Sequence, residues 1–553
     1  MNRSVLTLLI LCVITFFLGL GRQAITDSDE GYYAEASREM VDSGDWLTPR
    51  FNYENRFEKP PLYYWLTAAT YLVTGPTEGA ARFWSAMSGA GLALLTWAIA
   101  GGRRRPEASW LAAAIVATSF GCFTMARWAL PDLPLAFFIT LTIWVALRAA
   151  EADSTNRSLK WWAIAGLSAG LGFLTKGPVS LVIPAIVLVP IWWWKRRVAR
   201  LDPRGLALAA LVFVIVGVPW YVLMWRVHGN EYLRGFFVGD NMERFATTRF
   251  NDARPIWYYA PVLIGGLLPW SPFLLTFIWR PMIAIAMVRR RARFSDLQWG
   301  LILWAVMPLL FYTLSIGKQP RYILPVLPPV AILLAQAISE RIAASRTDDH
   351  RRQPGLAGAT WATSALYIAL ALLFVRMQPL FISTYAVLTW TAAGLALCAA
   401  IAFAVVAATQ AWTRLPAVGA TAAAALLIAV QFGALSGRRP EAVEQMAALV
   451  LANRSGNEPV ALYNVFIRNL TFYTRLEVVQ PFDVKQAVGL LRSSQRLLLV
   501  ASADDVKAIQ AALGTPLHTL GSVRYMNTAN IRVGTLVQSQ PDDVTDVLLV
   551  VNH

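Results

Sequence analysis

Apolar runs of membrane-spanning length recur along most of the chain, and short polar connectors separate them. About 20 apolar residues in a helix cross the hydrocarbon core of a bilayer. Thirteen runs can be delimited, at residues 4–21, 79–101, 109–126, 133–150, 161–175, 179–194, 205–225, 257–279, 297–316, 322–339, 357–375, 384–409 and 414–434. We therefore predict a polytopic α-helical membrane protein in which residues 1–435 form a domain of about 13 transmembrane helices. The first run is long for a signal peptide and no Ala-X-Ala site follows it, so we interpret it as a retained helix.

The basic residues between these runs indicate an orientation. Arginine and lysine gather in four connectors, within residues 103–105, 195–204, 289–293 and 341–352. The positive-inside rule places such connectors in the cytoplasm, which agrees with an inside N-terminus and an odd number of spans. Membrane orientation thus accounts for much of the net charge of +16. No basic, aromatic-rich soluble segment favours nucleic-acid binding. We expect contacts with membrane lipids and no nucleic-acid partner.

Residues 436–553 have the composition of a soluble domain. Helix-like EAVEQMAALVLANR, DVKQAVGLLRSS and DDVKAIQAALG alternate with strand-like PVALY, RLLLVAS and IRVGTLVQS. This alternation predicts a small α/β domain, which an odd number of preceding spans places in the periplasm. No glycine-rich phosphate loop follows any of these strands. We interpret the domain as a cap or an interaction surface.

The long outer loop, residues 22–78, contains two amphipathic stretches, DSDEGYYAEASREMVDSGDWL and PPLYYWLTAATYLVTG. Their aromatic residues suit the headgroup region, so we predict periplasmic juxtamembrane helices that lie along the interface. Asp29 follows the first transmembrane helix, where it either caps the next helix or takes part in chemistry. Glu35 and Glu39, one helical turn apart, are predicted to form a solvated face.

Ionisable residues, which are costly near hydrocarbon, gather at the outer ends of the helices. They are Asp29, Glu30, Glu58, Lys59, Arg127, Asp132, Lys176, Arg244, Lys318 and Arg321. Cations neutralise phosphate oxygens, whereas carboxylates suit a general base, a metal, or hydrogen bonds to sugar hydroxyls and amines. The mixture favours a phosphate-bearing lipid with a sugar head. Simpler roles stay open, because Asp132 can shape a turn, the cations can extend to headgroups, and Lys59 can pair with Glu58 at the surface.

Cysteine and histidine give little support for a metal centre. The three cysteines all lie in apolar runs, and no two of the four histidines are spaced as metal ligands. We therefore expect no required cofactor. A divalent metal stays open, without His or Cys ligands to support it.

Six stretches follow one another between the apolar runs: DSDEGYYAE, FEKPPLYYW, RWALPDLPLAFF, FLTKGP, FFVGDNMERF and KQPRYILPVLPP. In this order they resemble the bacterial aminoarabinose transferases, which are membrane glycosyltransferases of the GT-C fold related to protein mannosyltransferases. The likeness covers residues 1 to about 435, and the ordered set carries it rather than any single piece. It implies an enzyme of the bacterial inner membrane whose active site faces the periplasm.

The resemblance also implies a reaction. The donor would be undecaprenyl phosphate that carries 4-amino-4-deoxy-L-arabinose, and the acceptor would be a phosphate of lipid A. The product has less negative charge, which gives resistance to polymyxin and other cationic antimicrobial peptides. Because the leaving group is an anion and the acceptor phosphate is ionised, fixed positive charge matters more here than a strong base. A single displacement inverts the anomeric carbon.

Individual roles follow from the same resemblance. Asp29 and Asp132 match the acidic positions of the catalytic centre, and Lys59 and Arg244 match the groups that hold the donor phosphate. Further cavity residues are expected at Glu58, Lys176, Lys318, Arg321 and Tyr322. One departure concerns FFVGDNMERF, where Gly239 and Asp240 stand in a stretch that often contains a histidine in related mannosyltransferases. This departure counts further against a histidine-containing metal site.

Two other functions stay open at this stage. An enzyme of the same build can move a hexose from polyprenyl phosphate to a protein hydroxyl, which requires a true general base. A transporter is disfavoured, because its ionisable residues usually lie near the midplane and its halves usually repeat.

Overall fold

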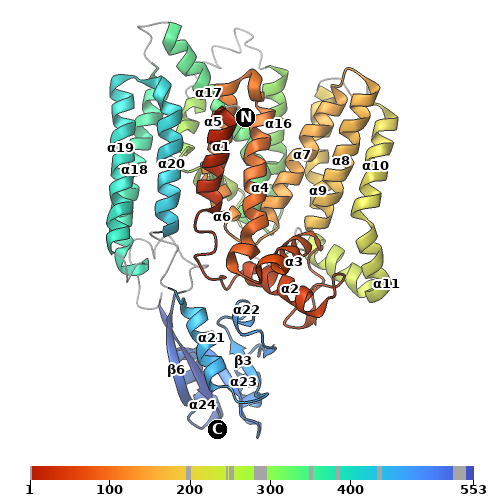
Figure 1. Cartoon of the computed structure of the whole chain (residues 1–553), viewed down its shortest axis with the longest axis vertical. Helices are drawn as coiled ribbons and strands as arrows, with labels where there is room; N and C mark the ends of the chain where they lie inside the picture. The colour runs from red at the N-terminus through yellow and green to blue at the C-terminus, as the bar shows by residue number, and fades with distance from the viewer. Residues whose placement is uncertain are drawn as a thin grey trace.

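The computed structural model describes residues 3–194, 201–243, 247, 254–278, 295–347, 353–381, 386–432, 439–526 and 544–553. These residues form a bundle of helices, a pair of helices that lie across one end of it, and a β-sheet module beyond that end (Figure 1). The structure therefore contains the α-helical bundle that the sequence predicts.

The bundle contains straight helices and several that continue into π- or 3-10 turns. Its first half consists of α1 (Arg3–Cys12) with η1 (Val13–Phe17), α4 (Glu78–Ile99), η2 (Gly102–Arg104), α5 (Pro106–Thr118), α6 (Phe120–Ala126), α7 (Asp132–Ala150), α8 (Thr155–Lys176), α9 (Val179–Trp194), α10 (Pro203–Gly217) and α11 (Pro219–Leu233) with η4 (Arg234–Glu243). Its second half consists of α13 (Tyr259–Gly266), η5 (Ser271–Leu274), α14 (Leu275–Ile278), α16 (Asp296–Leu314), η6 (Pro320–Val326), α17 (Leu327–Thr347), α18 (Pro354–Phe381), α19 (Ala386–Thr409), η7 (Trp412–Arg414) and α20 (Leu415–Val430).

Among the described residues, six helices are long and apolar enough to cross a membrane, or up to nine if each bent pair counts as one span. Shorter apolar helices occupy two more of the predicted runs, at Arg3–Phe17 and Val179–Trp194. A multi-pass membrane protein is thus confirmed, while the number thirteen stays a prediction.

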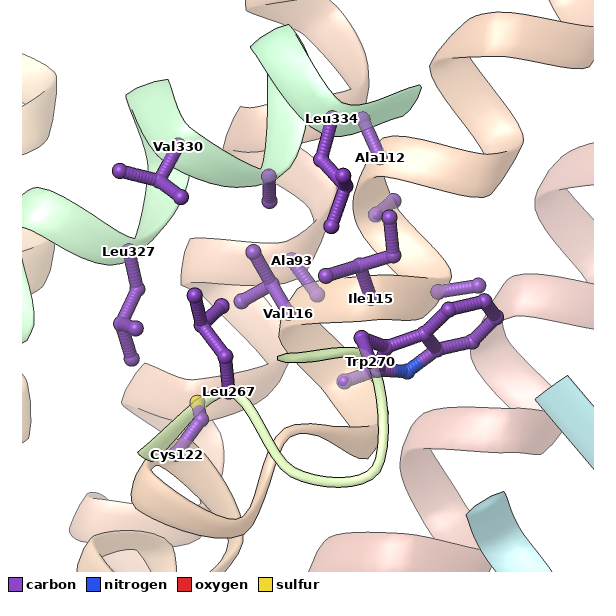
Figure 2. Packing of buried hydrophobic residues seen from close by; sticks show 14 of the residues in the cluster. Ala93, Ala112, Ile115, Val116, Cys122, Leu267, Trp270, Leu327, Val330 and Leu334 are labelled. Carbon is purple, nitrogen blue, oxygen red and sulfur yellow. The ribbon is translucent and has the colours of Figure 1, made fainter. Parts of the chain in front are cut away.

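Three of the apolar runs are bent rather than straight. The helix pair α5 and α6 turns by 56°, α10 and α11 turn by 42°, and α13 and η5 turn by 118°. The last bend contains Pro269, which has no amide hydrogen to continue a helix. Trp270 in this bend packs with Ile115 and Val116 of α5 (Figure 2), and its indole N–H donates to Thr118 Oγ1 at 2.9 Å. The run 257–279 is therefore folded back on itself.

The predicted juxtamembrane helices are α2 (Asp29–Ser43) and α3 (Leu62–Thr74), joined through the short strands β1 (Arg50–Phe51) and β2 (Glu54–Asn55). Ser28 caps α2, because its hydroxyl accepts the amide hydrogen of Glu30 at 3.3 Å. Gly44 ends the helix in the left-handed region, at a φ of 69°, which suits a residue without a Cβ atom. Tyr33 of α2 stacks on Tyr64 of α3, and both rings are buried.

The C-terminal module, residues 439–526 and 544–553, has a five-stranded sheet in the order β4-β3-β5-β7-β6. Strands β3, β4 and β5 are parallel, and β7 runs antiparallel to both β5 and β6. Its elements are α21 (Ala442–Asn453), β3 (Val460–Tyr463), α22 (Leu470–Thr474), β4 (Val478–Val479), α23 (Val484–Leu491), β5 (Leu498–Ser502), α24 (Ala503–Leu513), β6 (His518–Tyr525) and β7 (Thr545–Val551). The predicted strand IRVGTLVQS lies outside the described residues. The exact boundary at residue 436 stays a prediction.

Candidate active site

Two of the predicted carboxylates and two of the predicted cations form one cluster. Arg321 in η6 makes an ion pair with Asp29 at the start of α2, and its Nε lies 3.6 Å from Asp132 Oδ2. Lys176 at the end of α8 lies 2.5 Å from Asp132 Oδ1. Four segments that are far apart in sequence thus bring their charges together at the end of the bundle that bears α2 and α3 (Figure 1).

Local sequence explains how each side chain reaches the cluster. Asp132 begins α7 directly after Pro131, and Lys176 is the last residue of α8 before Gly177, whose φ is 76°. Tyr322, next to Arg321 in η6, places its ring 5.1 Å from Lys176 Nζ. A cation over an aromatic face is held in place without losing its charge. Tyr322 is therefore part of the cluster, and its contact with a substrate stays a prediction.

Asp29 is the accessible member of the cluster. Its side chain is 45% exposed, whereas that of Asp132 is 5% exposed. Burial by itself raises the pKa of Asp29, but the charges of Arg321, Arg468 and Lys59 outweigh it and lower the pKa to about 2. Asp29 is consequently an anion at any physiological pH, and its oxygens can accept hydrogen bonds from a substrate.

Lys59 has a different partner from the one considered above. Its ammonium makes an ion pair with Asp240 of η4, and the two side chains are 12% and 7% exposed. Glu58 pairs instead with Arg56. The alternative of an exposed pair between Glu58 and Lys59 is thus wrong, because the Lys59 ammonium is largely buried against Asp240. The partner of Lys59 is thus Asp240, one of the two residues found where related mannosyltransferases often have a histidine.

A cavity of about 540 Å³ lies beside this ion pair. Its lining includes Glu58, Arg234, Gly239, Asp240 and Glu243. Glu58 therefore lines this cavity, and its contact with a substrate stays a prediction. Arg244, the other predicted donor-phosphate ligand, lies outside the described residues.

Lys318 is buried, at 6% exposure, near the same end of the bundle. Its ammonium donates to the carbonyl oxygen of Ser315, and Arg254 O lies 3.4 Å away. These contacts link the turn before η6 to neighbouring backbone. They do not bring Lys318 to Asp29 or Asp132, so its predicted role in the cavity rests on sequence alone.

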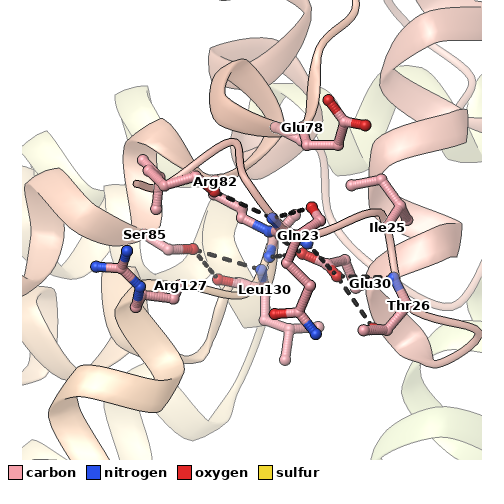
Figure 3. A network of polar contacts seen from close by, with 12 residues as sticks. Gln23, Ile25, Thr26, Glu30, Glu78, Arg82, Ser85, Arg127 and Leu130 are labelled. Atoms are coloured by element: carbon pink, nitrogen blue, oxygen red, sulfur yellow. Dashed lines mark hydrogen bonds and ion pairs between the residues drawn. The ribbon is translucent and has the colours of Figure 1, made fainter. Parts of the chain in front are cut away.

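Glu30, beside Asp29, serves the architecture of the loop rather than the cluster. Its carboxylate accepts from Arg82 Nε at 2.7 Å and from Ala129 N at 2.9 Å, and it is fully buried. Arg82 of α4 also donates to the carbonyl oxygens of Leu20 and Gln23 (Figure 3). Buried polar groups need such partners. This network fixes the path of the chain from α1 into α2, and therefore the position of Asp29.

The prediction of a solvated face at Glu35 and Glu39 is wrong. Both side chains are buried, at 0% and 2% exposure. Arg38 neutralises Glu35 through Nη2 at 2.6 Å, while Glu39 accepts the amide hydrogen of Tyr53 at 3.0 Å. The turn between β1 and β2 covers this side of α2, and a single-sequence pattern does not reveal such a cover.

A metal centre receives no support from the arrangement. The described residues contain no group of three or more His, Cys, Asp or Glu side chains that could hold a metal ion. The carboxylates Asp29 and Asp132 each face a cation instead. The cluster therefore combines positive charges with two fixed carboxylates. The positive charges suit a phosphate ester, and the carboxylates suit a polar group attached to it.

Comparison with known proteins gives concordant results. The family model for dolichyl-phosphate-mannose-protein mannosyltransferase matches residues 4–232. An undecaprenyl phosphate-alpha-4-amino-4-deoxy-L-arabinose arabinosyl transferase of Pseudomonas aeruginosa (strain UCBPP-PA14) is 34% identical over 409 residues, which are 71% of each chain. The arabinosyl transferase 2 of the same name from Pseudomonas fluorescens (strain Pf0-1) is 32% identical over 371 residues. That match covers 66% of this chain and 64% of the Pseudomonas fluorescens protein. A match to an arabinosyl transferase 2 of Proteus mirabilis (strain HI4320) covers 57% of that protein.

Solved structures extend the likeness to the whole fold. The structure of ArnT from Cupriavidus metallidurans bound to undecaprenyl phosphate has a TM-score of 0.77 at 22% identity, and covers 99% of this chain and 98% of that chain. The archaeal oligosaccharyltransferase AglB from Archaeoglobus fulgidus has a TM-score of 0.53 at 13% identity, covering 94% of this chain and 69% of that one. These likenesses establish a GT-C type of fold.

Proposed function

The chain belongs to the undecaprenyl phosphate-alpha-4-amino-4-deoxy-L-arabinose arabinosyl transferases, and from this premise we propose that it moves 4-amino-4-deoxy-L-arabinose from undecaprenyl phosphate to a phosphate of lipid A. The donor class agrees with the solved ArnT structure, which is described as bound to undecaprenyl phosphate. The single observation that carries the proposal is the cluster of Asp29, Asp132, Lys176 and Arg321. Its cations suit a phosphate, and its carboxylates suit an amino sugar.

The proposed reaction is one displacement at the anomeric carbon. An oxygen of the acceptor phosphate forms the new glycosidic bond, the bond to the donor's phosphate oxygen breaks, and undecaprenyl phosphate leaves as an anion. Fixed positive charge stabilises that leaving group, and Lys59 and Arg244 are the residues proposed to supply it. The anomeric centre inverts. No step requires a metal or another cofactor.

Asp29 is proposed to orient the acceptor rather than to remove its proton. A carboxylate whose pKa is lowered to about 2 is too weak a base to hold the proton of a phosphate monoester. Its exposed oxygens can accept hydrogen bonds from the acceptor's sugar hydroxyls. Asp132, deeper in the cluster, is proposed to hold the donor's sugar, including its ammonium group, in exchange for part of its contact with Lys176.

The proposed location is the bacterial inner membrane, with the cluster and the C-terminal module on the periplasmic side. Donor and acceptor lipids then both reach the cluster from the outer leaflet. Resistance to polymyxin would follow, because each transferred amino sugar lowers the negative charge of lipid A. The proposal therefore ties the position of the α2 and α3 layer to the place where both substrates reside.

The test is mass spectrometry of lipid A from cells that lack their own transferase, with and without this gene. We expect a mass gain of one or two aminoarabinose units and increased survival in polymyxin. In purified protein, Asp29→Asn should lower turnover by a hundredfold or more. Arg321 loses one of its two charged partners, and one of the two oxygens that accept hydrogen bonds from the substrate is replaced by an amide NH2 group. A drop of less than tenfold contradicts the role of Asp29.

A second candidate is a protein O-glycosyltransferase that uses a polyprenyl-phosphate sugar. The match of residues 4–232 to the mannosyltransferase family model favours it. If lipid A stays unmodified in cells with well-expressed protein, sugar on periplasmic proteins is the product to look for.

A further inference from the structure

The C-terminal module touches the loop that carries Asp29, and it presents Arg468 there. The amide hydrogen of Arg468 is donated to Asp27 Oδ1 at 2.8 Å. On the other side of Asp29 in sequence, a Cβ atom built on Gly31 would lie 2.4 Å from the carbonyl oxygen of Arg468. Only a glycine permits that approach. The main chain of Arg468 is therefore held against the loop both before and after Asp29.

Neighbouring residues of the module complete this attachment. Asn469 Nδ2 donates to the carbonyl oxygen of Ile25 at 2.8 Å, and the amide hydrogen of Ile25 is donated to Tyr473 OH at 2.8 Å. The amide hydrogen of Ala24 is donated to Glu441 Oε1, also at 2.8 Å. The loop's backbone groups thus find their partners in the module, and α22 lies against α2 (Figure 1).

The guanidinium of Arg468 is held in place but is not neutralised by an ion pair. It lies 5.3 Å from the centre of the Tyr32 ring, and its Nη1 is 3.5 Å from the carbonyl oxygen of Asp27. Its buried Nε has no hydrogen-bond partner among the residues that the structure describes. Within the described ranges no carboxylate oxygen lies within ion-pair distance of it, whereas Lys176 pairs with Asp132, and Arg321 pairs with both Asp29 and Asp132.

The charge of Arg468 nevertheless acts at the cluster. It is one of the three cations, with Arg321 and Lys59, whose field acts on Asp29. Because this guanidinium is only half-buried and makes no ion pair among the described residues, its terminal N–H groups can bind an anion next to the loop that carries Asp29. Arginine binds phosphate oxygens through parallel N–H donors, which lysine does not reproduce.

We propose that Arg468 binds the phosphate group of a substrate at the Asp29 centre, so that the C-terminal module contributes directly to the site. The inference rests on the proposed function, in which two phosphates meet at this centre. The phosphate can be that of the polyprenyl donor or that of the lipid A acceptor, and the chemistry of recognition is the same. The module is then a substrate-binding part rather than the cap or interaction surface expected from the sequence.

The test uses the purified full-length protein and measures binding of undecaprenyl phosphate and of lipid A separately. We expect Arg468→Met to weaken binding of at least one of these two probes by tenfold or more, and Arg468→Lys to recover part of the loss. The probe that weakens identifies the source of the phosphate. Arg492→Met is the matched control, because Arg492 is an exposed arginine at the end of α23 in the same module.

A second variant separates phosphate binding from attachment of the module. Tyr473→Phe removes the acceptor for the Ile25 amide without changing any charge. It should leave the affinity for both probes within about threefold of the wild type. The inference is overturned if Arg468→Met binds both probes as the wild type does, or if Tyr473→Phe weakens them as much as Arg468→Met.

These outcomes are distinct from failure of the proposed function. Binding is measured without turnover, so a wild type that binds both lipids but never modifies lipid A contradicts the proposed reaction only. A wild type that modifies lipid A, with an Arg468→Met variant of normal affinity, contradicts the inference only.

Discussion

Glu39 is a buried carboxylate whose charge is poorly compensated. In the described part of the chain its Oε1 has no hydrogen-bond partner, and Glu35 lies one turn away on α2. Burial first, and the charge of Glu35 second, raise the pKa of Glu39 from 4.5 to about 7, while the Tyr53 amide and Arg38 oppose the rise. Folding thus favours the protonated form. The resulting stability is present below pH 4.5 and is lost as the pH rises through about 7.

Because deprotonation of Glu39 lowers stability as the pH rises, we predict that the thermal midpoint of the wild type falls by a few degrees between pH 5 and pH 8. Glu39→Gln should remove most of that fall, because the amide has no proton to release. Thermal unfolding of the purified protein across this range measures the difference. Glu477→Gln, at an exposed position of the C-terminal module, is the control and should keep the wild-type dependence. Equal curves for Glu39→Gln and wild type would contradict the prediction.

Residue by residue, the sequence revealed the site's charges but not their partners. The sequence predicts site residues at Asp29, Asp132, Lys176, Arg321 and Tyr322, and the structure brings these five side chains together. Their pairings depend on the packing of four segments, which no local pattern encodes. Arg82 and Arg468 were overlooked because each is a single arginine near an apolar or mixed segment, with no motif around it. The only available cue was the cost of an arginine within an apolar run, as at Arg82 in run 79–101.

At the scale of elements, α4 and the loop before α2 depend on one buried ion pair. The side chains of Arg82 and Glu30 are 1% and 0% exposed. Arg82 additionally donates to three backbone carbonyl oxygens, those of Leu20, Gln23 and Ala24. Removing one partner of such a pair leaves an uncompensated buried charge, which costs about 3–5 kcal/mol.

We therefore predict that Arg82→Met lowers the free energy of unfolding by about 3–5 kcal/mol. Unfolding by SDS in mixed micelles provides the measurement. Arg157→Met is the matched control, since Arg157 pairs with Asp153 at the surface, with exposures of 63% and 88%. That variant should lose less than about 1 kcal/mol. Similar losses in the two variants would show that the buried network does not hold α4 to the loop.

Elements whose pattern is simple were predicted best. Amphipathic α2 and α3 and the helices α21, α23 and α24 were expected from their periodicity, and each is present. The bends were not, because hydropathy reports that a run is buried in apolar surroundings and not whether it is straight. Pro269 in run 257–279 was the available cue. Strands β6 and β7 were also missed. β7 lies between β5 and β6 in the sheet, and this pairing is not visible in the local sequence of either strand.

At the scale of the whole molecule, the membrane bundle and the C-terminal module meet where Gly31 contacts Arg468. No other residue fits at this point, because the Cβ of alanine would lie 2.4 Å from the carbonyl oxygen of Arg468. The carbonyl oxygen of Arg468 cannot easily move away, because hydrogen bonds of Asp27 and Asn469 hold this part of the backbone in place. A methyl group at position 31 must separate the two parts locally.

Gly31→Ala should consequently loosen the module while the helix bundle stays folded. We expect faster proteolysis of residues beyond 439, and activity reduced at least tenfold because both Asp29 and Arg468 shift. Limited proteolysis followed by mass spectrometry locates the cleavage, and circular dichroism checks that helix content is retained. Gly489→Ala is the matched control, because nothing lies within 4 Å of its added Cβ. If Gly31→Ala resists protease and turns over like the control, the two parts do not depend on this contact, and the module's attachment must reside in the side-chain hydrogen bonds of Tyr473, Asn469 and Glu441 instead.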